Sequence, residues 1–206
     1  MSSRRTFLRL ASALLLPAIG WHSRPASAQG AMERATAFIK SVGDQLVAVV
    51  NGPDSEREKR TKLTAIIDNA VDVDGVARFC LGRYWRTASA EQQHRYVELF
   101  HQVLVNNITA KIGDYRGVQF EMGRAQQRED NAVVSTVVRR PNNAPTNVDW
   151  VVSNPGSDPK IIDVVAEGTS LRLTQRQDYA SYLSHNNNNI DALINAMRQQ
   201  LSSEAG

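Results

Sequence analysis

Side chains able to do acid–base or metal chemistry are few and widely spaced in this 206-residue sequence. His94 and His101 lie seven residues apart, on one side of a predicted helix, but neither has a Cys, Asp or Glu at the spacing of a metal site. The run Asp72–Gly75 resembles part of a calcium loop, yet Leu81 occupies the position of its bidentate acid. We therefore expect surface or core-edge histidines, a helix cap within Asp72–Gly75, and neither a metal ion nor a cofactor.

Nucleophilic chemistry is equally poorly supported by the sequence. Cys80 is the single cysteine, so an internal disulfide is excluded, and its apolar helical surroundings predict a core residue and not a nucleophile. The sequence has no Gly-rich phosphate loop and no Ser nucleophile elbow. Asp163 and His101 are the only side chains we can name as an acid–base candidate inside a pocket. The sequence therefore predicts a protein that is not an enzyme.

The first 28 residues have the three parts of an export signal: a basic start, an apolar stretch from Leu10 to Ile19, and small residues up to Ala28. Ser3 to Arg9 reads SRRTFLR, which resembles a twin-arginine signal. We expect cleavage after Ala28 and export to a bacterial periplasm. We expect no membrane span in the mature chain, because it has no second apolar run that is long enough.

The charge balance changes once this signal is removed. Residues 1–28 hold four of the 24 basic side chains and no acidic one, so residues 29–206 have 20 basic against 21 acidic side chains, a net charge of −1. A nucleic-acid-binding surface needs a basic excess, which is missing here. The length of residues 29–206 fits a single domain.

Helical spacing of apolar residues predicts four helices in the first half. Asp72 or Asp74 would cap a short helix that ends at Gly82. Ser89 and Gln92 have the spacing of a capping box and would begin the longest helix. The predicted helices cover, in order, about residues 31–50, 55–70, 72–82 and 89–112.

After Tyr115 the apolar period changes from helical to two. Val148, Trp150 and Val152 would share one face of a strand, and Asp163 would lie opposite Val164 on the next. The four predicted strands cover residues 117–127, 131–140, 146–154 and 159–168, and two closing helices cover about 174–184 and 190–201. Helices, then an antiparallel meander, then helices predict the α+β fold class.

The segment LGRYWRTASAEQQHRYVELFHQVLV, which begins at Leu81, resembles a block of the MlaC or toluene-tolerance family of periplasmic phospholipid-binding proteins. NVDWVV, IIDVVAEGTSL, RQDY and IDALINAMR follow in the family's order, so the resemblance covers about residues 31–201. Four positions depart from the family pattern in the expected core and bear on which lipid is held: Ile108, Pro159, Gln175 and Tyr179.

The resemblance implies a fold and a function. The fold would be an NTF2-like, four-stranded twisted antiparallel sheet with closing C-terminal helices around an apolar cavity for acyl chains. The function would be a phospholipid shuttle between an outer-membrane lipoprotein complex and an inner-membrane ABC transporter with a lipid-binding component. Burying one methylene is worth about 0.8 kcal/mol, so two chains of roughly fourteen methylenes cost on the order of 20 kcal/mol to expose. Such cargo needs an apolar protein site.

Candidate lipid contacts come from the predicted inner face of the sheet and from the helices expected to face it. Tyr84 and Trp85 could gate the mouth of the site. Arg83 and Arg86 could meet lipid phosphate or an acidic partner, or they could be solvated charges at a helix end. The ten expected contact residues are Phe79, Trp85, Val103, Leu104, Ile108, Phe120, Val134, Trp150, Val152 and Val164.

Three other functions stay open at this point. A carrier of hopanoid or sterol-like lipid would also need an apolar slot. A hydrolase or lyase on an NTF2-like scaffold would use Asp163 or His101, and a periplasmic adaptor would hold no ligand. No helix in the sequence is an obvious dimer contact, so we expect a monomer.

Overall fold

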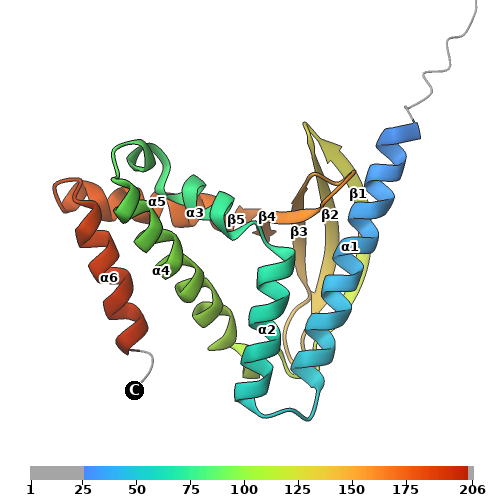
Figure 1. Ribbon diagram of the computed structural model, residues 1–206. Coiled ribbons are helices and arrows are strands. Elements are labelled where there is room, and N and C mark those ends of the chain that lie inside the picture. Colours follow the sequence, from blue (N-terminus) through green and yellow to red (C-terminus); the bar gives the residue numbers. More distant parts are fainter. Residues whose placement is uncertain (1–25, 204–206) are drawn as a thin grey trace, which may run out of the picture.

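The computed structural model describes residues 26–203. The export signal is predicted for residues that lie almost entirely outside this range, so the signal and its cleavage after Ala28 stay predictions. The first half of the described chain is helical, as expected (Figure 1). Its elements are α1 (Ala26–Asn51), α2 (Glu56–Ala70), α3 (Val73–Leu81), the 3-10 turn η1 (Gly82–Arg86), α4 (Ala90–Thr109) and the 3-10 turn η2 (Ile112–Tyr115).

The helix boundaries follow the capping residues of the sequence. Asp72 caps α3 by accepting a 2.9 Å hydrogen bond from the Gly75 backbone N–H, and Gly82, with φ of +58°, ends that helix. The predicted capping box of Ser89 and Gln92 begins α4. The prediction that α4 continues to Ile112 is wrong, because the helix ends at Thr109. The Thr109 hydroxyl donates to the Val105 carbonyl, and the chain then tightens into η2.

The sheet has five antiparallel strands in the order β1-β2-β3-β4-β5, so the prediction of four strands is corrected. The fifth strand is only two residues long, too short to show an alternating pattern. Glu167 and Gly168, both with positive φ, form the tight turn that pairs it with β4. The strands are β1 (Gln119–Arg128), β2 (Asn131–Arg139), β3 (Thr146–Ser153), β4 (Lys160–Ala166) and β5 (Thr169–Ser170).

A register shift between β3 and β4 decides which side chains face the core. Trp150 pairs with Val164, but after the shift at Val151 the partner of Val152 is Ile161. Simple alternation groups Ile162 with Val164, whereas the bulge brings Ile161 into the apolar cluster that contains Val164. The alternating pattern of the sequence therefore predicted the strand correctly but did not show that Ile161 is one of its core residues.

Most of the buried apolar side chains belong to two clusters. The first, here called the sheet cluster, lies where α1 and α2 pack on one face of the sheet (Figure 1). Its most buried members are Ala35, Ile39, Val42, Ala70, Ala132, Val134, Val152 and Ile161. The second, the helical cluster, is built from α3, η1, α4 and the C-terminal helices α5 (Leu171–His185) and α6 (Ile190–Ser203). The closing helices pack mainly on α3 and α4, and α5 also contacts β4.

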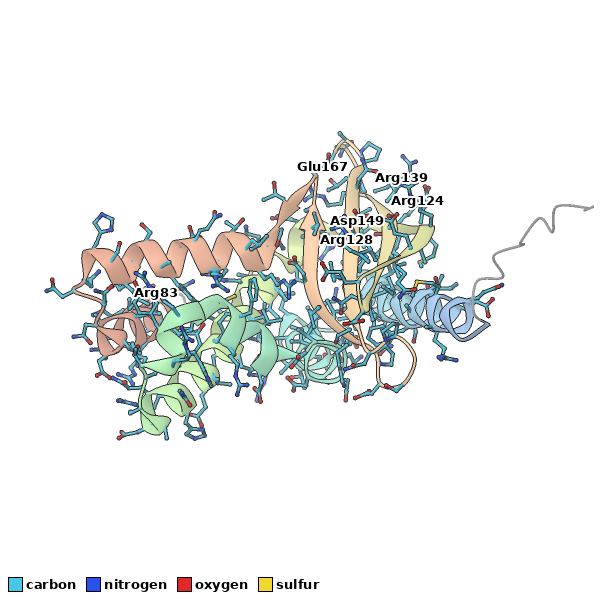
Figure 2. The ribbon with its side chains drawn as sticks, turned by 90° about the horizontal axis from the view of Figure 1, so that it is seen from above. Arg83, Arg124, Arg128, Arg139, Asp149 and Glu167 are labelled. Atoms are coloured by element: carbon cyan, nitrogen blue, oxygen red, sulfur yellow. The ribbon has the colours of Figure 1, made fainter. Side chains whose placement is uncertain are left out.

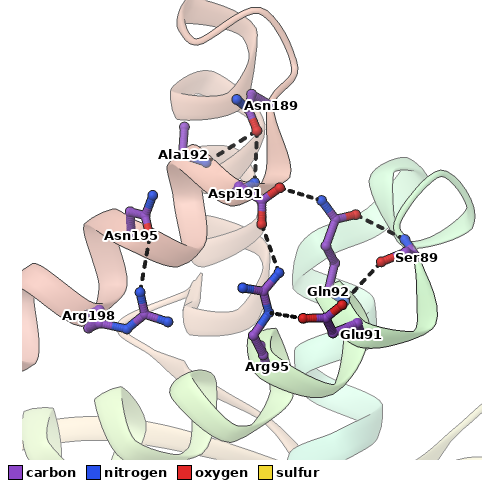
Figure 3. Close-up of polar contacts among 9 residues, drawn as sticks. All are labelled: Ser89, Glu91, Gln92, Arg95, Asn189, Asp191, Ala192, Asn195 and Arg198. Atoms are coloured by element: carbon purple, nitrogen blue, oxygen red, sulfur yellow. Dashed lines mark hydrogen bonds and ion pairs between the residues drawn. The ribbon is translucent and has the colours of Figure 1, made fainter.

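A polar network fixes α6 against the start of α4 (Figure 3). The Asp191 carboxylate accepts hydrogen bonds from Gln92 Nε2 at 2.8 Å and from an Arg95 guanidinium nitrogen at 3.0 Å. The Asn189 side chain accepts from the Asp191 and Ala192 backbone N–H groups and so caps α6. Because Gln92 also completes the capping box of α4, one side chain joins the beginnings of both helices.

Gly43 lies where α1 comes close to Phe120 of the sheet. A Cβ atom there would lie 2.5 Å from a ring carbon of Phe120 on β1, well inside van der Waals contact. The absence of a side chain at Gly43 leaves the space that the Phe120 ring occupies.

We predict that Gly43→Leu lowers the free energy of unfolding by about 1–3 kcal/mol through overpacking, although Leu is the better helix former. Urea titration followed by circular dichroism would measure this loss. Gly113→Ala is the matched control, since nothing lies within 4 Å of its added Cβ, and it should leave stability unchanged. Equal stability of Gly43→Leu and wild type would contradict the assigned packing.

Candidate functional site

The structure divides the ten expected contact residues between the two clusters. The helical cluster holds Phe79, Trp85, Val103 and Leu104, and the sheet cluster holds Phe120, Val134, Trp150, Val152 and Val164. Ile108 belongs to neither, because its side chain is 40% exposed on α4, where the buried positions are Val105, Asn106 and Thr109. The structure therefore places nine of the ten residues in two clusters and Ile108 at the surface.

The members of the sheet cluster differ in how tightly they are held. Val134 and Val152 are fully buried, so a ligand would reach them only by displacing other side chains. Phe120 and Trp150 are partly buried, with ring centroids 6.0 Å apart. The Trp150 indole N–H donates to the Thr136 hydroxyl at 2.9 Å, which fixes the ring orientation. These two rings form the accessible apolar margin of the sheet cluster.

Tyr84 and Trp85 do not form a pair of gating rings. Tyr84 is buried, and its hydroxyl donates to the Asn188 side chain at 2.9 Å, so it joins η1 to the loop before α6. The Arg83 guanidinium stacks on the Tyr84 ring and donates to its hydroxyl. Trp85 is partly buried at the edge of the helical cluster, below the guanidinium of Arg78 at 4.9 Å. The aromatic–basic stretch is therefore mainly a packing element of the helical cluster.

The two proposed acid–base candidates lie in separate polar clusters. Asp163 is buried and accepts hydrogen bonds from the Ser170 hydroxyl at 2.6 Å and from two backbone N–H groups, those of Val164 and Arg172. Its carboxylate also lies 3.4 Å from Arg172 Nε. Through these contacts Asp163 holds the start of α5 against β4. A carboxylate is favourable there because it lies at a helix N-terminus.

His101 on α4 has a different partner. Its Nε2 lies 2.6 Å from a carboxylate oxygen of Asp68 on α2, a residue 33 positions earlier in the chain. His94 is mostly exposed and pairs with Glu98 one turn further on. Within residues 26–203 no group of three or more His, Cys, Asp or Glu side chains could hold a metal ion.

Two of the surface clefts bear on the candidate site. One, of about 310 Å³, is lined by Asp72, Asp74, Gly75, Arg78, Trp85 and Val97. The other, of about 400 Å³, lies between α2, α4 and α6 and is lined by Arg60, Thr64, His101, Gln102, Val105, Asn106 and Leu201. Both linings mix charged or polar groups with a few apolar ones. Neither cleft combines the expected contact residues of the two clusters.

Comparison with known proteins identifies the family of this chain. Residues 40–199 match the family described as MlaC protein, and the chain belongs to that family, as its sequence motifs predicted. No helix within residues 26–203 combines the length and apolar character needed to cross a membrane.

Two curated relatives and one solved structure are similar to the chain. "Toluene tolerance protein ttg2D" of Pseudomonas putida is 26% identical over 135 residues, which are 64% of this chain and 62% of that protein. "Intermembrane phospholipid transport system binding protein MlaC" of Haemophilus influenzae is 23% identical over 175 residues, covering 80% and 81% of the two chains. A phospholipid-binding protein from Ralstonia solanacearum, solved with a phospholipid, shares the fold with a TM-score of 0.72 at 20% identity, covering 84% of this chain and 99% of that one.

The bonding of Asp163 predicts a structural role. Replacing it with Ala would leave the Arg172 guanidinium without its carboxylate and the start of α5 without two acceptors, so we expect Asp163→Ala to lose about 2–4 kcal/mol of unfolding free energy. Asp149→Ala is the matched control. Asp149 lies on the neighbouring strand β3 (Figure 2), and its carboxylate has no hydrogen bond or ion pair within the described residues. Chemical denaturation of both variants would test this difference, and equal losses would contradict it.

Cys80 predicts a pH dependence of stability. Its burial raises the pKa of the thiol to about 12, an effect that the nearby Arg172 guanidinium partly opposes. An unfolded chain has a cysteine pKa of about 8.5, so above that pH the unfolded state loses a proton that the folded state keeps. The stabilisation is therefore complete below about pH 8.5 and decreases as pH rises toward 12.

We predict that the advantage of wild type over Cys80→Ala shrinks between about pH 9 and pH 10.5, by at most about 1.4 kcal/mol per pH unit. Both proteins share every tyrosine, so the difference between their unfolding free energies isolates the thiol. Urea titrations at a series of pH values would measure it. A constant difference would show that the thiol ionises normally in the folded state.

Proposed function

We propose that this chain is a phospholipid-binding carrier of the bacterial periplasm, exported by the twin-arginine route as residues 29–206. The observation that carries this proposal is its membership of the MlaC family over residues 40–199. Relatives named for intermembrane phospholipid transport and for toluene tolerance support it, as does the shared fold of a protein solved with a phospholipid. Its partners would be an inner-membrane ABC transporter with a lipid-binding component and an outer-membrane lipoprotein complex, and it would act as a monomer without catalysis.

The division of the interior into two clusters supports an acyl-chain site that opens when lipid enters. The two clefts are small and partly polar, whereas a pair of acyl chains needs a continuous apolar lining. Phe120 and Trp150 are already partly exposed at the margin of the sheet cluster, and Leu104 has the same position in the helical cluster. We propose that acyl chains enter along these margins and come to cover Val134, Val152 and Val164. Ile108 would stay at the surface.

A carrier without catalysis also agrees with the placement of the titratable groups. Asp163 is occupied with the start of α5, and His101 is paired with Asp68 on another helix. A hydrolase or lyase would need such groups to converge on one pocket. A carrier of hopanoid or sterol-like lipid remains the second candidate, because a rigid polycycle would use the same apolar margins.

Lipid carried through purification gives the direct test. The mature chain is exported, purified without detergent and extracted with organic solvent, and mass spectrometry of the extract should show a diacyl phospholipid. A polycyclic triterpenoid would support the second candidate, and the absence of any lipid in a folded protein would overturn the proposal.

A matched pair of variants would locate the site. Phe120→Ser removes apolar surface from the sheet-cluster margin, so we predict that its retained lipid falls severalfold relative to wild type. Ile108→Ser removes a similar side chain from the exposed surface of α4 and should retain lipid normally. Retention is measured per folded chain, with folding checked by circular dichroism. Equal retention by both variants would exclude the margin at Phe120.

A further inference from the structure

Two arginines of α5 share one aromatic ring of α3. The guanidinium carbon of Arg172 lies 4.4 Å from the centroid of the Phe79 ring, and that of Arg176 lies 4.9 Å from it. Residues 172 and 176 are one helical turn apart, so both side chains leave the same face of α5. Each guanidinium is attracted by the ring, but the two cations repel each other. An anion close to both would remove this repulsion.

The position of Arg176 is fixed by the backbone of the neighbouring turn. One of its guanidinium nitrogens donates to the Phe79 carbonyl at 3.2 Å. Gly82 makes room for the group, because a Cβ atom at Gly82 would lie 3.1 Å from the guanidinium. The remaining N–H groups of Arg176 donate to no atom in residues 26–203. Its donors are therefore held in place before any ligand arrives.

The charges at this position do not balance within the described chain. Asp163 is the carboxylate of the cluster; it pairs with Arg172 and already accepts from Ser170 and two backbone N–H groups. Arg176 makes no ion pair with a described residue. Arg172 Nε is buried yet makes no hydrogen bond of acceptable geometry within the described chain. One positive charge and several guanidinium donors are thus left for an external acceptor, and the planar donor fork of a guanidinium suits a phosphate.

Apolar side chains on both sides of the arginines favour a lipid over a free anion. Leu171 and Leu173 flank Arg172 in the sequence and are 53% and 48% exposed, among the most exposed large apolar residues described. On a helix they point to either side of the face that carries Arg172 and Arg176. Phe79 itself borders the helical cluster. The combination of fixed cations with exposed leucines fits the junction between a phosphate and the apolar part of an amphiphile.

We infer that Arg172 and Arg176 bind the phosphate of the carried lipid, with Phe79 as the aromatic platform that orients them. This inference rests on the proposed function and adds a headgroup subsite to it. Arg172 is held by Asp163, and Arg176 supplies the charge that has no protein partner. The subsite recognises the phosphate shared by phospholipids, and it accordingly discriminates against diacylglycerol, which has the same acyl chains and no phosphate.

The test compares the delipidated full-length mature chain with its Arg176→Gln variant. The probes are fluorescent phosphatidylglycerol and diacylglycerol with identical acyl chains. Wild type should bind phosphatidylglycerol about tenfold or more tightly than diacylglycerol, the effect of one or two charge-assisted hydrogen bonds. Arg176→Gln should weaken phosphatidylglycerol binding about tenfold and leave diacylglycerol binding unchanged, which a general loss of structure would not do.

Two further variants keep the result interpretable. Arg198→Gln removes an exposed arginine of α6 that bonds only Asn195, and it should bind both probes as wild type does. Arg176→Lys keeps the charge without the planar fork, so it should lie between wild type and Arg176→Gln, and it also serves if the Gln variant fails to fold.

The outcomes separate the subsite from the function. Wild type binding neither probe would overturn the proposed function together with the subsite. Lipid binding that Arg176→Gln leaves unchanged, or weakens equally for both probes, would overturn the subsite alone. Inorganic phosphate bound by lipid-free wild type as tightly as phosphatidylglycerol would identify a free-phosphate site and overturn the headgroup assignment.

Discussion

The fold depends on the division of its apolar side chains into two separate clusters. Within each cluster, burial of apolar surface supplies the stability, because side chains such as Val152 and Leu183 are fully removed from water. Several of the contacts that join the elements of the two clusters are polar. His101 meets Asp68 and Arg60 meets Asn106 between α2 and α4, and Asp163 joins β4 to α5. The exposed contact of His101 with Asp68 can be exchanged for water at little net cost, whereas the buried carboxylate of Asp163 cannot.

In the proposed function, this division would let one domain remain folded in water and still accept acyl chains. A permanently empty cavity large enough for lipid would lose the dispersion contacts of its lining, and a solid core would admit nothing. Two clusters with partly buried margins avoid both difficulties. The rings of Phe120 and Trp150 stay half covered without a ligand, and a ligand that covers them adds apolar burial to the bound state.

Local features of the sequence predicted most of the elements, and contacts between distant residues account for the rest. Ser89 with Gln92, Asp72 and Gly82 act over three or four residues, so the boundaries they set were visible in the sequence. The bulge at Val151, the two-residue β5 and the exposure of Ile108 depend on neighbours that periodicity does not contain. The contact of Arg176 with Phe79 joins residues 97 positions apart, and no local pattern marks either one as its partner. The expected contact residues were correctly identified as apolar, but the sequence could not show that they belong to two clusters.

Asp163 shows why a residue type alone is weak evidence for chemistry. A carboxylate between apolar residues of a strand has the appearance of a catalytic group, and burial of an unpaired charge would be costly. Here the charge is satisfied by the hydroxyl of Ser170, by backbone N–H groups and by Arg172. These bonds set the point at which α5 leaves the sheet, and α5 in turn places Arg172 and Arg176 on the Phe79 ring. A buried acid thus positions two cations through the helix that it anchors, which suits the proposed binding role.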